Sequence, residues 1–179
     1  MAKKAYIILL SLFCCFCYTQ EKEAKSFDFA FSPGIIVQRN IFLDANVLIG
    51  KTFSNLNSKI PIVGIQGIRI GLETDCNNTF APKIGYELTP MIYTLRLSAI
   101  NYFQNDNTEF RIIPEIGLSF YSWINLTYGY GISLNNGNIS DIGHHRIALT
   151  FNFNKKLSKK YLDTLLKNQA AKNPGTNVD

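Results

Sequence analysis

The stretch from residue 124 to residue 134 reads INLTYGYGISL, and every second residue in it is apolar. Its apolar members Ile124, Leu126, Tyr128, Tyr130 and Ile132 share one side of an extended chain, while the other side carries asparagine, threonine, glycine and serine. Successive side chains of a β-strand point to opposite faces, so this period of two predicts a strand over residues 123–134. The same apolar residues do not form a single stripe at helical spacing.

The same alternation recurs seven more times between turn residues. The other predicted strands cover residues 27–38, 41–53, 61–73, 80–88, 91–103, 109–120 and 144–154. An even number of antiparallel strands can close into a barrel without a free edge. The sequence therefore predicts an all-β fold, an eight-stranded antiparallel up-and-down barrel over residues 27–154.

Two details of the pattern are less regular. In the third segment, Val63 and Ile65 are out of phase with the later apolar residues, and a bulge near Gln66-Gly67 would restore the phase. Prolines lie inside two other segments, at positions 33 and 114, although each removes a donor from the hydrogen-bond ladder.

The connections alternate in length. Tight turns are predicted at residues 88–90 and 121–122, and longer polar loops at residues 74–79, 104–108 and 135–143. With the amino terminus on the periplasmic side, the longer loops fall outside the cell, which is typical of small outer-membrane barrels.

The polar face of the segments is rich in small residues, and its charges are spaced singly, as a cramped interior requires. A solvent-exposed face would be dominated by lysine, glutamate, glutamine and serine instead. The predicted interior charges are the acids Asp28, Asp44, Glu73, Glu87 and Glu115 and the bases Arg69, Lys83, Arg96, Arg111 and Arg146. Because an unpaired buried ion is costly, we expect these five acids and five bases to form a charge-paired network in a closed lumen.

The apolar face carries almost no charge, and we expect it to contact lipid. Aromatic residues recur on it toward the segment ends, as in an aromatic girdle at a membrane interface. They are Tyr86, Tyr93, Tyr102, Phe103, Phe120, Trp123, Tyr128 and Tyr130. A soluble lipocalin-like carrier shows the same alternation with the two faces reversed, and it remains an alternative.

Two segments carry a resemblance to a known family. LTYGYG at residues 126–131 and IALTFNF at residues 147–153 resemble the closing strands of small eight-stranded outer-membrane β-barrel proteins of Gram-negative bacteria. The resemblance implies a transmembrane barrel in the cell outer membrane, with membrane lipid and the barrel assembly machinery as partners. Such barrels often end on an aromatic residue, whereas here residues 154–179 follow Phe153, so an assembly signal at Phe151 or Phe153 would be internal.

The two ends of the chain differ from the barrel region. Residues 1–19 have the layout of a secretory signal peptide, with two lysines, an apolar run and a final Cys17-Tyr18-Thr19. An N-terminus acylated at one of the signal's cysteines is an alternative. Residues 20–26 form a polar segment, and residues 155–179 a basic tail, which we expect to form in part a short amphipathic helix that starts at Ser158.

Composition excludes several classes of protein. With 46% hydrophobic and only 17% charged residues, the chain is not disordered as a whole. Its formal charge of +5 resides in the two ends, which leaves the barrel region without the clustered basic residues of a nucleic-acid-binding protein. Cys76 is the one cysteine outside the predicted signal, so no intramolecular disulfide is expected.

We therefore expect a non-enzymatic barrel with a structural or surface-interaction role, without a cofactor, a metal or catalytic residues. One alternative is a lipid-modifying barrel enzyme, because His145, Ser140 and Asp141 are the residue types of a nucleophilic triad. His144 and His145 with Asp141 also resemble a small part of a metal site, although a spaced further ligand is missing. The ligand of the outer loops cannot be read from the sequence.

Overall fold

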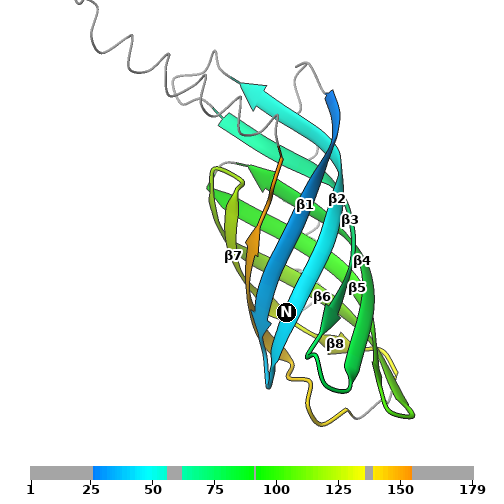
Figure 1. Cartoon of the computed structure of the whole chain (residues 1–179). Helices are drawn as coiled ribbons and strands as arrows, with labels where there is room; N and C mark the ends of the chain where they lie inside the picture. The colour runs from blue at the N-terminus through cyan, green and yellow to red at the C-terminus, as the bar shows by residue number, and fades with distance from the viewer. Residues whose placement is uncertain (1–25, 56–61, 91, 136–138, 155–179) are drawn as a thin grey trace, which may run out of the picture.

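The computed structural model describes residues 26–55, 62–90, 92–135 and 139–154. These residues form β-strands and their connections (Figure 1). No helix in this part of the chain is long and apolar enough to cross a membrane. The predicted signal peptide, nearly all of the polar segment that follows it and the basic tail lie outside the described residues.

From β1 to β7 each strand pairs antiparallel with the next, β8 also pairs with β6, and β9 pairs with both β7 and β1. They are β1 (Ser26–Val37), β2 (Ile41–Asn55), β3 (Ile62–Thr74), β4 (Thr79–Pro90), β5 (Tyr93–Gln104), β6 (Asn107–Phe120), β7 (Ile124–Tyr130), β8 (Ile132–Ser133) and β9 (His145–Phe151). Since β7 and β8 both pair with β6 in one continuous register, they are two pieces of a single strand. The predicted closed eight-stranded antiparallel barrel is therefore confirmed.

The register around the barrel fixes its width. The path of paired residues that leaves β1 at Phe27 passes through all the other strands and returns to β1 at Val37, so the shear is about ten residues. Eight strands with this shear tilt by roughly 40° to the barrel axis and enclose an interior that side chains fill. The lumen is therefore occupied by the side chains that point inward, and their polarity sets its character.

Prolines occupy the gaps in the hydrogen-bond ladders. Pro33 lies where the β1–β9 pairing lapses between Gly34 and the isolated Phe31–Phe153 bridge. Pro82 lies in a gap of the β4–β5 pairing. Pro114 lies opposite the break between β7 and β8. Proline has no N–H to donate, so one ladder bond is omitted at each site, yet the register continues unchanged on both sides without a bulge.

The bulge expected near Gln66-Gly67 is also absent. β3 keeps an unbroken register with both of its neighbours. Ile65 stays in phase with the inward-facing residues and is fully buried in a small apolar cluster with Ala30 and Leu48. The prediction was wrong because the lumen accepts apolar side chains at this end of the barrel.

Two connections differ from the prediction. Residues 104–108 do not form a longer loop, because Gln104 pairs with Asn107 around a two-residue turn, Asn105-Asp106. Asn105 has a φ of 52°, which asparagine tolerates better than most residues. The turn predicted at residues 88–90 is strand instead, since β4 continues to Pro90. Extra cross-strand hydrogen bonds favour the longer strands at both places.

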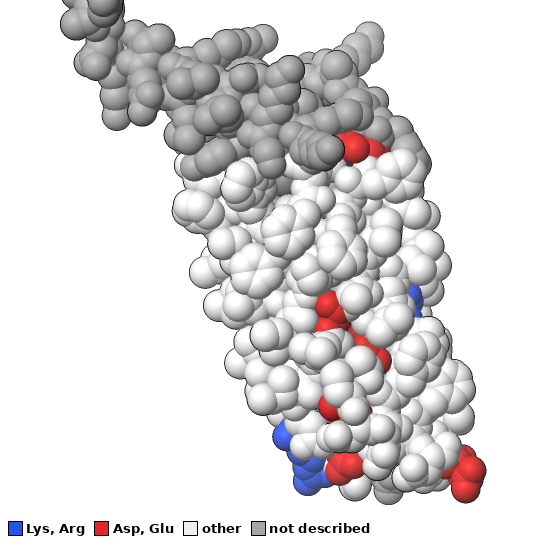
Figure 2. Space-filling view, viewed as in Figure 1, with Lys and Arg blue, Asp and Glu red and all other residues white. Residues whose placement is uncertain are grey.

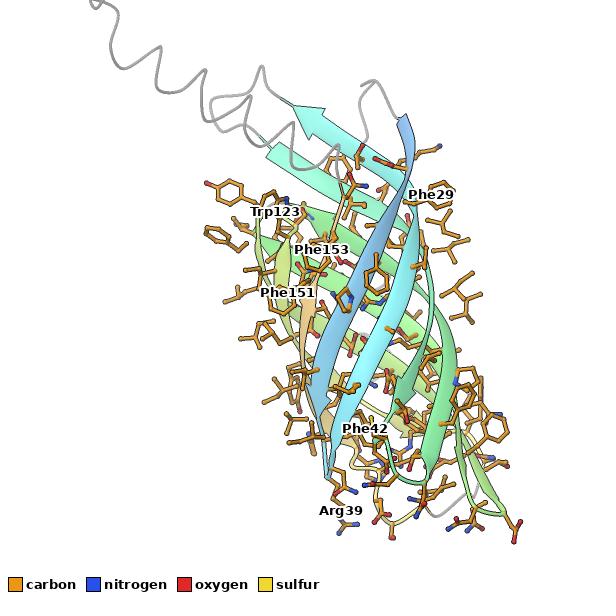
Figure 3. The ribbon with its side chains drawn as sticks, in the orientation of Figure 1. Phe29, Arg39, Phe42, Trp123, Phe151 and Phe153 are labelled. Carbon is orange, nitrogen blue, oxygen red and sulfur yellow. The ribbon has the colours of Figure 1, made fainter. Side chains whose placement is uncertain are left out.

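The two faces of the wall alternate as expected along most of each strand, for example in β7, where exposed and buried residues strictly alternate. Phe29 is 61% exposed, whereas Phe42 is fully buried inside the barrel (Figure 3). Tyr102 was expected on the apolar outer face, but it is fully buried in the lumen. Because Tyr102 and Phe103 are adjacent aromatic residues, the sequence does not show which of them faces outward at this end of the strand. In the closed barrel, Tyr102 faces the lumen.

Candidate functional site

A closed ring of alternating charges crosses the lumen. It contains four acids and four bases from β2, β3, β4, β5, β6 and β9, and each side chain contacts an opposite charge on either side. In order around the ring they are Asp44, Arg69, Glu87, Arg96, Glu115, Arg146, Glu73 and Lys83, which contacts Asp44 again. The ring carries no net charge, because every acid is matched by a base.

The contacts in the ring are short, and the side chains are nearly inaccessible. Lys83 Nζ lies 2.6 Å from Asp44 and 2.8 Å from Glu73, and Arg69 lies 2.5 Å from Glu87. The longest contact joins Arg96 to Glu115 at 3.9 Å. None of these side chains is more than 5% exposed. In such a low-dielectric setting, each charge is tolerated only because its neighbours compensate it.

Neutral side chains complete the hydrogen bonding of the ring. Tyr102 donates its hydroxyl to Glu73 Oε2 at 3.1 Å, and Arg96 donates to Thr150 Oγ1 at 2.6 Å. Glu87 Oε1 accepts hydrogen bonds from Thr89 Oγ1 and Asn152 Nδ2. Asp44 Oδ1, Glu115 Oε1 and Arg146 Nε make ion-pair contacts without hydrogen-bond geometry, and the hydrogen bonds of the other ring atoms favour one packing arrangement.

The lumen differs on the two sides of the ring. We call the end with the β1–β2, β3–β4, β5–β6 and β8–β9 connections the loop end, and the other the terminal end. Nine apolar residues, among them Phe42, Tyr102 and Ile113, form a buried cluster whose members Ile139 and Ile142 come from the β8–β9 connection. This connection therefore folds inward and inserts two isoleucines into the barrel at the loop end.

A second ion pair ties the β8–β9 connection to the wall. Glu109 Oε1 lies 2.7 Å from Arg111 Nε, and Glu109 Oε2 accepts the backbone N–H of Ile139. Arg111 also donates to the backbone carbonyls of Gly143, at 2.7 Å, and Ile142. Both side chains of the pair are buried, and their hydrogen bonds fix residues 139–143 of this connection, which we call the plug.

A cavity of about 710 Å³ opens beside this plug at the loop end. Its lining mixes cations, hydroxyls and imidazoles with two isoleucines. The lining residues are Arg39, Glu109, Arg111, Tyr130, Ser133, Asn135, Ile139, Ser140, Ile142, Gly143, His144 and His145. A volume of this size accommodates a small ligand or a lipid headgroup.

The turn between β3 and β4 at the loop end is organised by Asp75. Its Oδ1 accepts the backbone N–H groups of Asn77, Asn78 and Thr79, and its Oδ2 accepts the Thr79 hydroxyl. Partial burial would raise the pKa of Asp75, but these hydrogen bonds, led by the Thr79 N–H, hold it below its ordinary value. Asp75 therefore stays ionised, and its hydrogen bonds fix the backbone of the turn.

At the terminal end the lumen is lined by small polar side chains beside the apolar cluster of Ala30, Leu48 and Ile65. Asn125 and Thr127 are 0% and 1% exposed, and neither side chain has a hydrogen-bond partner among the described residues. Buried polar groups of this kind are normally satisfied by ordered water.

The suggested catalytic triad is not assembled among the described residues, because His145 makes no hydrogen bond to Ser140 or Asp141. His145 shares a hydrogen bond of 2.6 Å with the Tyr128 hydroxyl, whereas Ser140 donates to Asp141 at 3.3 Å. Asp141 is also held by Gln104 at 2.8 Å. His144 stacks on Tyr130 at 5.8 Å. The described residues contain no group of three or more metal-ligating side chains, so His144, His145 and Asp141 do not form such a cluster.

Of the ten charges predicted to line the interior, the ring holds eight, and Arg111 lies in the separate pair at the loop end. Asp28 is not a member of the ring; it is half-buried and accepts the backbone N–H of Phe29 at 2.9 Å. Sequence reasoning missed Glu109 as an interior charge. It occupies the first predicted position of its segment, and its shared phase with Arg111 is the signal that identifies it.

Comparisons of the chain with protein-family models, curated protein sequences and solved structures find no match. The resemblance to small outer-membrane barrels therefore rests on the strand pattern and on the barrel itself.

Proposed function

We infer that the protein is an integral outer-membrane β-barrel of a Gram-negative bacterium with a closed, charge-paired lumen and a structural or surface-interaction role. The observation that carries this inference is the distribution of side chains across the wall. Charges are enclosed, and large apolar side chains are exposed. Membrane lipid would cover the outer face, and the barrel assembly machinery would insert the chain.

The exposed apolar side chains occur on every strand of the barrel. They include Phe31 on β1, Leu43 on β2, Ile68 on β3, Ile84 on β4, Leu97 on β5, Leu118 on β6, Leu126 on β7, Ile132 on β8 and Ile147 on β9. The wall that faces the viewer in Figure 2 is mostly white between its two ends, with small patches of charged atoms at mid-height. In water so large an apolar surface would aggregate, and a bilayer is the environment that suits it.

The contents of the lumen argue against two other roles. An open channel needs a water-filled interior, but an eight-stranded barrel with this shear is filled by its side chains, here by the charge ring and the plug. A soluble lipocalin-like carrier needs an apolar cavity inside and polar side chains outside. The distribution observed here is the reverse.

A fractionation experiment tests the membrane assignment. We expect the protein, expressed with its N-terminal segment, to remain in the outer-membrane fraction after sodium carbonate washing. We also expect the unboiled protein to migrate differently from the boiled one on a gel, since a closed barrel resists detergent. Release into the carbonate supernatant would contradict the membrane assignment and favour the soluble carrier.

A charge placed on the outer wall should cost stability according to its depth. Leu97 lies in the middle of β5 and is 55% exposed, whereas Leu134 lies at the loop end and is 57% exposed. We expect Leu97→Lys to lower the free energy of unfolding in lipid vesicles by about 2–4 kcal/mol and Leu134→Lys by less than about 1 kcal/mol. Urea titration followed by tryptophan fluorescence measures both, and equal small costs would mean that water, not lipid, surrounds Leu97.

A further inference from the structure

The cavity at the loop end is lined by Arg39, whose positive charge is not balanced by an acidic side chain of the lining. Arg39, in the β1–β2 connection, donates one hydrogen bond to the backbone carbonyl of Ser140, and no ion pair between described residues includes it. Figure 3 shows its side chain at the lower tip of the barrel. A guanidinium has five N–H donors in a planar fork, so most of its donor capacity remains for a ligand.

The one acidic side chain in the cavity lining is already engaged. Both oxygens of Glu109 are used, one by Arg111 and the other by the N–H of Ile139. The charges of Glu109 and Arg111 cancel, so the lining keeps the positive charge of Arg39. An anion is therefore the ligand that this cavity would attract.

The imidazole of His144 adds a second polar contact. Its Nδ1 lies 3.0 Å from the carbonyl of Gly131, which can only accept, so Nδ1 carries the proton and Nε2 is an acceptor that can take a hydrogen bond from a P–O–H group of a phosphate. The ring is held in place by stacking on Tyr130. The hydroxyls of Ser133 and Ser140 also line the cavity; they donate to the Asn135 carbonyl and to Asp141, and would exchange these bonds to contact an oxyanion.

The wall next to the cavity is apolar. Tyr130 lines the cavity and is 44% exposed on the outer face, and β7 continues from it with the exposed side chains of Tyr128 and Leu126. On the neighbouring strand, Ile147 is 52% exposed. A polar, positively charged cavity thus adjoins a strip of apolar wall, which is the arrangement that a phosphate group attached to acyl chains requires.

We propose that this cavity binds a phosphate-bearing anion, with Arg39 as the principal contact and His144 as the second. The phosphate is either free or the headgroup of a lipid, and the lipid source rests on the membrane location proposed above. Arg39 would make a bidentate contact with two phosphate oxygens.

Calorimetric titration of the refolded barrel in uncharged detergent micelles tests the site. The probes are inorganic phosphate and dihexanoyl phosphatidic acid, with dihexanoyl phosphatidylcholine as the neutral-headgroup control. We expect both anions to bind and Arg39→Gln to weaken each by about tenfold or more, because a charge-assisted bidentate contact is lost. We expect His144→Gln to weaken binding by about threefold, the loss of one hydrogen bond.

The matched control is Lys51→Gln, which removes an exposed cation from β2 near the terminal end. It should leave binding unchanged. Tighter binding of the phosphatidic acid supports a lipid headgroup, and equal binding of both anions supports free phosphate. Absence of binding, or equal losses in the Arg39 and Lys51 variants, would overturn the proposal. Since gel mobility first verifies the folded barrel, this failure would leave the carbonate-wash result untouched.

Discussion

Replacing Glu73 with glutamine is expected to lower the free energy of unfolding of the refolded barrel by about 3–5 kcal/mol. Glu73 is fully buried and contacts Lys83 at 2.8 Å, Arg146 at 2.8 Å and the Tyr102 hydroxyl. The substitution keeps the shape of the side chain but leaves the lumen with one uncompensated positive charge. Urea unfolding in detergent micelles measures the loss.

A second substitution separates charge from packing. Glu73→Gln combined with Lys83→Gln makes the ring neutral again, so we expect it to recover at least half of the lost stability. Asp106→Asn is the matched control, because it removes an exposed acid from the β5–β6 turn. If Glu73→Gln costs no more than Asp106→Asn, the ring contributes little to the stability of the fold.

Replacing Gly50 with valine is expected to prevent the barrel from closing. A Cβ at Gly50 would lie 1.9 Å from the carbonyl oxygen of Gln66 and 2.6 Å from the Cα of Gly67. Both are backbone atoms of β3, directly across the ladder, so β2 and β3 would have to separate. We expect a loss of at least about 3 kcal/mol and no band with the mobility of a folded barrel.

Two further variants make this result interpretable. Gly50→Ala should show an intermediate loss, since it adds only the Cβ. At Gly131, the nearest atoms to an added Cβ belong to the Arg111 side chain, at 3.3 Å, so this side chain would have to shift by only a few tenths of an ångström. Gly131→Ala should therefore cost less than about 1 kcal/mol. Normal refolding of Gly50→Val would show that the β2–β3 contact is less tight than described.

The interior charges show how far sequence reasoning reached. Alternation assigned Asp44, Arg69 and Glu87 to the polar face, and the structure places them in the lumen. Their contacts could not be foreseen, because each neighbour in the ring depends on the register between strands. Arg146 meets Glu73 across 73 positions of sequence, a contact that only closure of the barrel creates.

The cavity at the loop end was beyond sequence reasoning for a similar reason. Arg39 and His144 were visible as a turn arginine and a histidine near the start of the last strand, with nothing to connect them. They line one cavity because β9 pairs with β1 and because Ile139 and Ile142 fold the β8–β9 connection inward.

The sequence by itself determined the number of strands, their alternation and which face of each is charged. Successive side chains of a strand point to opposite faces whether or not the strand is paired. The tertiary structure alone decided the register, the ring, the inward phase of Tyr102 and the glycines that allow two backbones to touch. Those features depend on distances between residues far apart in the chain, and these distances are set only when the barrel closes.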